Sequence, residues 1–165
     1  MSAPTEGATP VGAASGAPAA GRPPARVQVS WAGDRRFDAG RPGGPTLRLD
    51  GSAETGQSPV DAVLSALAAC TGVDVVDILA KRRTPAESLT MDVTGQRWSG
   101  TPGRLTHVRL EYTITGAGIE RVHAERAIEL AVTKYCSVRD SLSREIGIEW
   151  TLTLNGETGE VRQES

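Results

Sequence analysis

Alternation of apolar and polar residues marks short strands along the chain. In residues 26–31, Val27, Val29 and Trp31 alternate with polar neighbours, the spacing of a strand with one buried face. Further strand segments follow, with Phe37 continuing the first pattern and Gly- and Pro-containing turns between segments. The predicted strands cover residues 26–31, 47–50, 89–98, 105–114 and 148–154.

A long helix is predicted over residues 58–83. Ser58 is a suitable N-cap, Pro59 fits the first helical position, and Asp61 adds a negative charge to the first turn. The middle of this helix is apolar on every side, so no side of it there is suited to solvent. We therefore expect it to be enclosed by sheet or by a second subunit, with Cys70 at the centre of the enclosed stretch.

A second helical region is predicted over residues 119–146, where apolar residues recur at helical spacing and Gly147 provides a stop. This region is longer than most helices of globular proteins, so a break inside it is expected. The resulting order is strands, helix, strands, helix and strand. That order predicts an α+β fold.

The composition divides the chain into one domain and two tails. Residues 1–25 consist mainly of Ala, Gly and Pro and are predicted to be a disordered tail without a signal peptide. Residues 26–157 suit a single domain, and residues 158–165 are predicted to be a polar C-terminal tail. The longest uncharged stretch, residues 62–73, is too short to span a bilayer as a helix.

The charge and the cysteine content limit the possible binding partners and the expected cellular compartment. The net charge is −2, with both signs intermixed and few aromatic residues, so neither nucleic acid nor a membrane is an expected partner. The chain has two cysteines and no secretory signal. This combination predicts a cytoplasmic protein in which a cysteine pair is catalytic or redox-sensing rather than a structural disulfide.

Two cysteine-centred motifs resemble the OsmC/Ohr family. The first leads from SPVD into ALAACTGVDVV around Cys70, and the second has RAIEL followed by KYCSV around Cys136. The resemblance runs from about residue 26 to residue 155 and is greatest to the OsmC-like branch. It implies an OsmC-like fold in which antiparallel sheets wrap a long central helix, and an intertwined homodimer with active sites at the subunit interface.

A cysteine pair suits peroxide reduction, because a thiolate that attacks an O–O bond becomes a sulfenic acid, and a second thiol can capture it as a disulfide. The resemblance implies that Cys70 attacks and Cys136 resolves, with an organic hydroperoxide or hydrogen peroxide as substrate and a lipoyl- or thioredoxin-type dithiol as reductant. No cofactor or metal is expected. Lys134 and Arg139 are near neighbours of Cys136, and the resemblance implies that Cys136 stands at the start of a helix; both features would favour its thiolate.

The resemblance departs from peroxidase-active members at Val60, where those proteins have Glu. Asp61 is adjacent and could support Cys70, although a negative charge at a helix N-terminus explains it equally well. The sequence does not choose the arginine that would hold the thiolate. The candidates from the N-terminal strands are Arg35, Arg36, Arg41 and Arg48.

Three alternatives remain open from the sequence. A cysteine in an Ala-, Leu- and Val-rich helix can be an inert buried residue. A zinc site could combine Cys70, Cys136, His107 and His123, but none of these forms a close ligand pair. Finally, the chain could be a non-catalytic OsmC-like module that binds a small ligand or senses oxidants, and Val60 favours this alternative.

Overall fold

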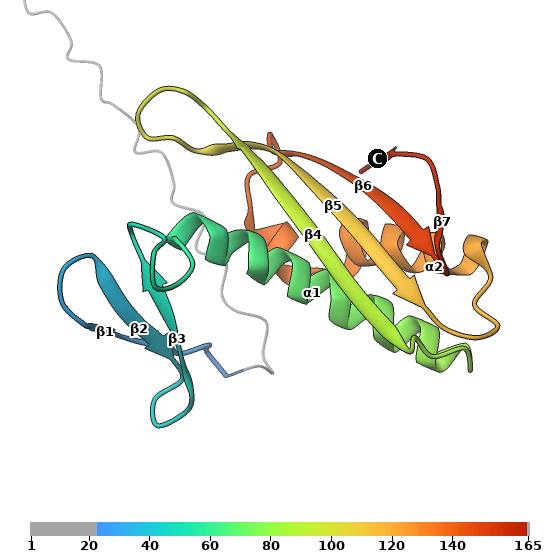
Figure 1. Cartoon of the computed structure of the whole chain (residues 1–165), viewed down its shortest axis with the longest axis horizontal. Coiled ribbons are helices and arrows are strands. Elements are labelled where there is room, and N and C mark those ends of the chain that lie inside the picture. The colour runs from blue at the N-terminus through green and yellow to red at the C-terminus, as the bar shows by residue number, and fades with distance from the viewer. Residues whose placement is uncertain (1–22, 165) are drawn as a thin grey trace, which may run out of the picture.

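The computed structural model describes residues 23–164 (Figure 1). Nearly all of the predicted N-terminal tail, residues 1–25, thus lies outside the described residues. The elements follow in the order β1 (Gln28–Trp31), β2 (Arg36–Gly40), β3 (Thr46–Asp50), α1 (Pro59–Lys81), β4 (Ser88–Arg97), β5 (Leu105–Thr115), α2 (Arg121–Leu130), a π-helical turn η1 (Ala131–Tyr135), α3 (Ser137–Ser141), β6 (Gly147–Leu154), β7 (Glu157–Thr158) and β8 (Arg162–Gln163).

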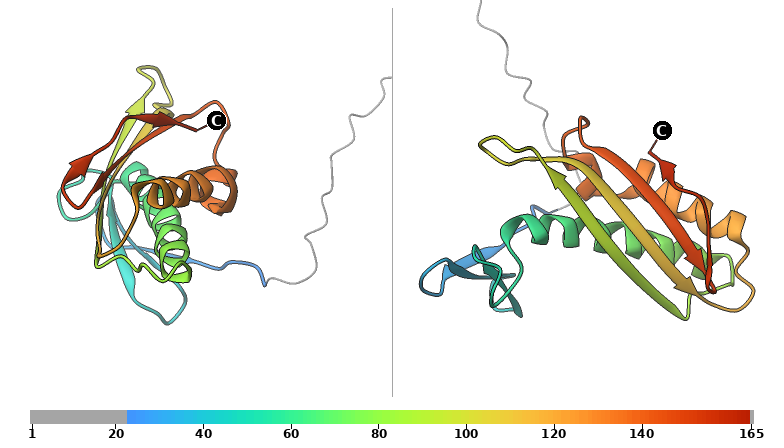
Figure 2. Two further views of the ribbon diagram at one scale, coloured as in Figure 1. Left: turned by 90° about the vertical axis from the view of Figure 1, so that its right-hand side faces the viewer. Right: turned by 45° about the horizontal axis from the view of Figure 1, so that its top comes forward.

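The strands form two sheets. β1, β2 and β3 make a small antiparallel sheet beside the N-terminal end of α1, and β2 had been anticipated only by Phe37 (Figure 1). The larger sheet has the order β4-β5-β6-β7, with β8 also paired to β6. α1 and α2 cover the same face of this sheet (Figure 2), which confirms the α+β class.

The larger sheet contains one parallel pair in addition to the antiparallel pairing that the resemblance implies. β4 and β5 are antiparallel, but β5 and β6 run parallel, with His107 opposite Gly147 and Ile114 opposite Leu154. A parallel pair needs a crossover connection, and the segment α2-η1-α3 supplies it. This crossover lies on the same face of the larger sheet as α1 (Figure 2).

The core lies between the larger sheet and the two helices. The inward residues of β5 and β6 are all buried, as the alternation in the sequence predicts. They pack against α1 and α2 in one apolar cluster. Its main members are Leu67, Val75, Leu79, Val108, Leu110, Tyr112, Ile114, Ala127, Ile128, Ile148, Trp150, Leu152 and Leu154.

α1 begins as predicted but is covered on only one side. Ser58 and Asp61 form a capping box, in which the Asp61 N–H donates to Ser58 Oγ (3.2 Å) and the Ser58 N–H donates to Asp61 Oδ2 (3.0 Å). On the opposite side of the helix from the core, Val73 remains 62% exposed and Val76 41% exposed. Within one chain, therefore, the expected enclosure of α1 is incomplete.

By length and composition alone, α1 could cross a membrane, since it has 23 residues and a mean hydropathy of 1.9 over its most apolar window. The core helices of globular proteins have the same properties. α1 buries Leu67, Val75 and Leu79 against the sheet, so its hydropathy is only a weak indication of a membrane span.

The C-terminal segment corrects the predicted domain boundary at residue 157. Residues 157–164 are part of the fold, because β7 and β8 both pair antiparallel to β6. Arg162 lies over the Trp150 ring (5.7 Å) and forms an ion pair with Glu125 of α2 (2.6 Å). This polar segment is ordered by backbone pairing and ion pairs, neither of which a hydrophobic pattern reveals.

Candidate functional site

The fold brings the two cysteines together. Cys70 lies in the middle of α1, and α1 packs against α2, η1 and α3. Cys136 follows η1 directly and is the N-cap of α3. The predicted break in the second helical region therefore falls at the second cysteine, and both cysteines are free thiols.

The break has a defined geometry. The Cys136 N–H donates to the carbonyl oxygen of Ala131 (3.0 Å), a bond over five residues that closes the π-helical turn. The chain then leaves the helix in an extended conformation at Cys136 and restarts as α3 at Ser137. Ser137 Oγ comes to lie 4.0 Å from Cys70 Sγ. The sequence motif includes Ser137, but its place beside Cys70 was not anticipated.

Cys70 is the thiol that ionises more readily. Its half-buried position works against the thiolate, and this desolvation is the largest single influence on its pKa. The backbone N–H of Val138, the Cys136 thiol, and the hydroxyl and N–H of Ser137 together outweigh the desolvation. The pKa of Cys70 therefore lies below its ordinary value.

Cys136 is the opposite case. Burial raises its pKa to about 11, and the neighbouring Cys70 adds to the increase through a hydrogen bond and its charge. Donation from the Arg139 N–H to Cys136 Sγ (3.2 Å) acts in the other direction but does not compensate. The expected helix start at Cys136 is thus present, whereas the thiolate expected there is not. Cys136 is a protonated thiol that can donate to Cys70.

A buried hydrogen-bond chain supports the helix next to Cys70. The Tyr112 hydroxyl of β5 donates to Thr71 Oγ1 (2.8 Å), and Thr71 Oγ1 donates to the carbonyl oxygen of Ala68 (3.0 Å). Tyr112 and Thr71 are both fully buried, and burial raises the pKa of Tyr112. The sequence presented Tyr112 only as one apolar position of a strand, so this link was missed.

The other predicted site residues are engaged elsewhere within the chain. Asp61 caps α1, and Val60 lies beside it in the first turn, far from Cys70 along the helix. Arg36 forms an ion pair with Asp34. Arg48 makes a bidentate contact with Asp38 (2.6 and 3.1 Å). Arg35 and Arg41 are exposed. Among residues 23–164, none of these groups makes a hydrogen bond or ion pair with Cys70.

The histidines lie apart from the thiols. His107 contacts Glu149 (3.4 Å), and His123 contacts Glu120 (3.5 Å). In the part of the chain that the structure describes, no group of three or more His, Cys, Asp or Glu side chains converges in a metal-binding arrangement. Nothing in the geometry of the two thiols therefore favours the zinc alternative.

A groove of about 510 Å³ runs along α1 beside β4, but neither cysteine lines it. Its walls are mainly apolar and come from both elements. The lining residues are Ala68, Ala69, Gly72, Val73, Val76, Asp77, Leu89, Thr90 and Met91. The groove follows the exposed side of α1, away from the thiol pair, and so is distinct from the reactive site.

The fold is a two-layer α+β arrangement. Its two thiols lie where the long helix α1 packs against the break in the second helical region. Residues 51–151, which include both cysteines, match the family described as OsmC-like protein. The chain is also 31% identical over 124 residues to protein YhfA of Escherichia coli strain K12, covering 74% of this chain and 92% of that protein. The chain belongs to the OsmC-like family.

Solved structures share the fold. An OsmC-like protein from Mycoplasma pneumoniae superposes with a TM-score of 0.68 at 20% identity, over 78% of this chain and 95% of that chain. An organic hydroperoxide resistance protein OsmC from Legionella pneumophila gives a TM-score of 0.58 at 15% identity, over 78% of this chain and 95% of that chain. At these identities the likeness is one of fold.

Proposed function

We propose that this protein is a thiol-dependent peroxidase that reduces organic hydroperoxides, or hydrogen peroxide, through Cys70 and Cys136. The observation that carries the proposal is the contrast between the two thiols. Cys70 is half-buried with a lowered pKa, and Cys136 is buried and protonated, with each thiol close enough to change the pKa of the other. An attacking thiol must be an accessible thiolate, and a resolving thiol must wait beside it. The substrate class is consistent with the name of the structural neighbour from Legionella pneumophila, an organic hydroperoxide resistance protein.

The reaction proceeds in three steps: oxidation of Cys70, formation of the disulfide and reduction of the disulfide. The Cys70 thiolate attacks the terminal peroxide oxygen; an S–O bond forms, the O–O bond breaks, and the alkoxide takes up a proton and leaves as the alcohol. Cys136 then loses its proton and attacks the sulfur of the Cys70 sulfenic acid, whose oxygen leaves as water when the S–S bond forms. An external dithiol of the lipoyl or thioredoxin type returns two electrons and two protons. The chemistry needs no cofactor, and its setting is the reducing cytoplasm.

The working unit is a homodimer. The exposed side of α1 and the β1–β3 sheet carry apolar residues that one chain leaves uncovered, among them Trp31 at 69% exposure and Val73 at 62%. A second copy that covers this side of α1 would complete the enclosure predicted from the sequence. Light scattering should therefore give twice the chain mass, and Val73→Asp should shift the protein towards the monomer. A compact wild-type monomer at micromolar concentration would contradict the dimer.

The dimer also offers a source for the missing cation. The sheet that carries Arg35 and Arg36 lies at the N-terminal end of α1, and within one chain it is separate from the larger sheet (Figure 1). The supporting arginine of Cys70 would come from this sheet of the second copy. Arg36→Ala or Arg35→Ala should then slow the attack on peroxide without preventing disulfide formation.

The two single cysteine variants test the enzyme proposal, because they should fail in different ways. Cys70→Ser should consume no peroxide. Cys136→Ser should consume an equimolar amount and stop as a sulfenic acid, which dimedone can trap and excess peroxide can oxidise further. The wild type should lose both free thiols together and recover them with a dithiol. Identical behaviour of the two variants would contradict the assigned roles.

The alternative is a redox-sensing or small-ligand-binding module, which the Val60 position and the absence of a contact between Cys70 and a carboxylate or guanidinium in residues 23–164 favour. In that case an oxidant would modify the thiols, but the protein would not consume peroxide catalytically. If the wild type keeps both thiols after exposure to cumene hydroperoxide and to hydrogen peroxide, the peroxidase proposal fails and the module takes its place.

A further inference from the structure

Arg139 is a buried cation three residues after Cys136. The residue is 3% exposed, and its guanidinium contacts Glu164, the last described residue, through Nε (2.7 Å) and Nη2 (2.6 Å). Nη1 and Nη2 also donate to the backbone carbonyl oxygens of Ser143 (3.1 Å) and Ile146 (3.2 Å), respectively. A buried guanidinium is costly unless it is paired and hydrogen-bonded, and each nitrogen of this one has a partner.

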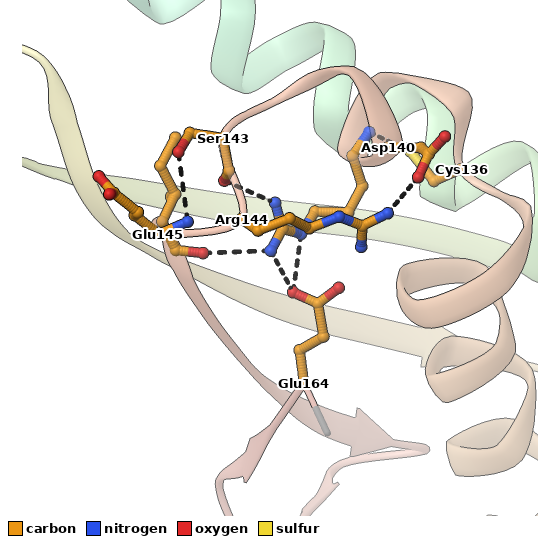
Figure 3. Close-up of polar contacts among 8 residues, drawn as sticks. Cys136, Asp140, Ser143, Arg144, Glu145 and Glu164 are labelled. Atoms are coloured by element: carbon orange, nitrogen blue, oxygen red, sulfur yellow. Dashed lines mark hydrogen bonds and ion pairs between the residues drawn. The ribbon is translucent and has the colours of Figure 1, made fainter.

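The same residue also contacts the second thiol. The Arg139 N–H donates to Cys136 Sγ (3.2 Å), so its backbone holds the sulfur while its side chain holds Glu164. Figure 3 shows Cys136 and Glu164 on either side of this network, with the Glu164 carboxylate directed towards the turn that carries Ser143. Arg139 thus bridges the cysteine turn and the C-terminal segment.

The C-terminal segment that carries Glu164 is held against the sheet by backbone hydrogen bonds. The Glu164 N–H donates to the carbonyl oxygen of Ile148 in β6 (2.9 Å), directly after the pairing of β8 with β6. The turn between α3 and β6 has much less support, with backbone bonds only from Leu142 to Arg139 and from Ile146 to Ser143. The Arg139–Glu164 contact is therefore a direct side-chain link between the segment that begins at Cys136 and the sheet, in addition to the packing of Cys136 in the core.

We propose that the Arg139–Glu164 ion pair positions Cys136 for its attack on Cys70. The inference rests on the proposed peroxidase function and adds a positioning residue to it. The attack replaces the S–O bond of the Cys70 sulfenic acid by an S–S bond, and the oxygen leaves as water. Disulfide geometry tolerates little displacement of the two sulfurs, so loosening the turn slows this step. The attack of Cys70 on peroxide forms no bond to Cys136; the turn influences this step only through the donors that lower the pKa of Cys70, so it slows much less.

Arg139→Lys is the sharpest test, because it keeps the charge and the backbone N–H while losing the fork that reaches Glu164 and both carbonyls at once. Arg162→Lys is the matched control, since it makes the same change in the same C-terminal segment at the contact with Glu125. Reduced full-length protein is mixed with an equimolar amount of cumene hydroperoxide, and dimedone-trapped sulfenic acid and disulfide are counted by mass spectrometry over time.

Arg139→Lys should form the disulfide about tenfold more slowly than the wild type and accumulate trapped sulfenic acid, with a clearly smaller fall in the rate of peroxide loss. Arg162→Lys should match the wild type. If Arg139→Lys does not fold, Glu164→Gln in the same assay decides, with the same slow disulfide step expected. Equal disulfide rates in the variant and the wild type would overturn the proposal, as would an equal fall in both steps.

A second oxidant separates this inference from the function on which it rests. Diamide adds to the Cys70 thiolate, and Cys136 then displaces it as the hydrazine, so the dithiol's two electrons and two protons go to diamide. A wild type that ignores peroxides but forms the disulfide with diamide would refute the peroxidase alone. Equal diamide rates in Arg139→Lys and the wild type would refute the positioning role alone.

Discussion

Alkylation near pH 9 should distinguish the two thiols by their ionisation. Cys136 has a pKa of about 11, so about 1% of it is thiolate at about pH 9. The pKa of Cys70 lies below the ordinary value of 9.0, so at least about half of it is thiolate at the same pH. The thiolate is the form that reacts, but it becomes less nucleophilic as its pKa falls, so iodoacetamide should modify Cys70 about fivefold faster than Cys136, as peptide mass spectrometry can measure.

The variant Cys70→Ser tests the origin of this difference. Burial is the main reason for the raised pKa of Cys136, and it remains in the variant, while the hydrogen bond and the charge from Cys70 disappear. The pKa of Cys136 should therefore fall from about 11 but stay above its ordinary value. The midpoint of the alkylation rate against pH measures this, because restricted access slows the reaction equally at every pH.

Cys136→Ala is the reciprocal experiment. If the two thiols interact, each must change the ionisation of the other, so the pKa of Cys70 should rise when alanine removes its thiol donor. An unchanged midpoint in both variants would refute the interaction. Faster alkylation of Cys136 than of Cys70 in the wild type would reverse the proposed roles.

Three further measurements test the frame around the site. Asp61→Asn should weaken the capping box with Ser58 and lower the urea midpoint slightly; a shifted pH profile of Cys70 alkylation would instead place Asp61 in the site. Tyr112→Phe should cost about 1 to 2 kcal/mol, because it removes the buried donor to Thr71, and an unchanged urea midpoint would contradict that. Hydrogen bonds donated to the Asp50 carboxylate lower its pKa to about 2. Its contribution to stability is therefore complete above about pH 4 and is lost as the pH falls towards 2. Asp50→Asn should flatten this part of the acid-unfolding curve, and an equally steep loss of stability in the variant would exclude this stabilising role of the carboxylate.

Much of the fold could be predicted because local signals agree with the tertiary structure. The alternation in β5 identifies the buried face that contains Leu110 and Tyr112, and Ser58 marks the start of α1 in its exact place in the chain. The excessive length of the second helical region indicated the break that falls at Cys136. The cysteine pair followed from the motifs, since the spacing in the sequence alone does not bring Cys70 and Cys136 together.

What the sequence did not reveal depends on pairing between distant segments. The parallel contact of β5 with β6 depends on the path of the crossover, and alternation within each strand is the same for either direction. Arg139 and Glu164 both look like solvated surface residues until the fold buries them together. Tyr112 looks like any other core position until its hydroxyl is found on Thr71.

The π-helical turn before Cys136 sets the direction in which this cysteine faces. A π-helical turn holds one residue more than an α-helical turn, and each residue of an α-helix turns the chain by about 100°. If Ala131–Tyr135 kept all five residues but adopted regular α-helical geometry, Cys136 would be rotated by about one residue, away from α1. Substitutions such as Thr133→Ala, at an exposed position, would leave the π-helical turn and that direction unchanged. Among natural variants of this chain, we therefore expect a single-residue deletion within η1 to occur only together with a regular α-helical turn, which returns the cysteine to the same direction.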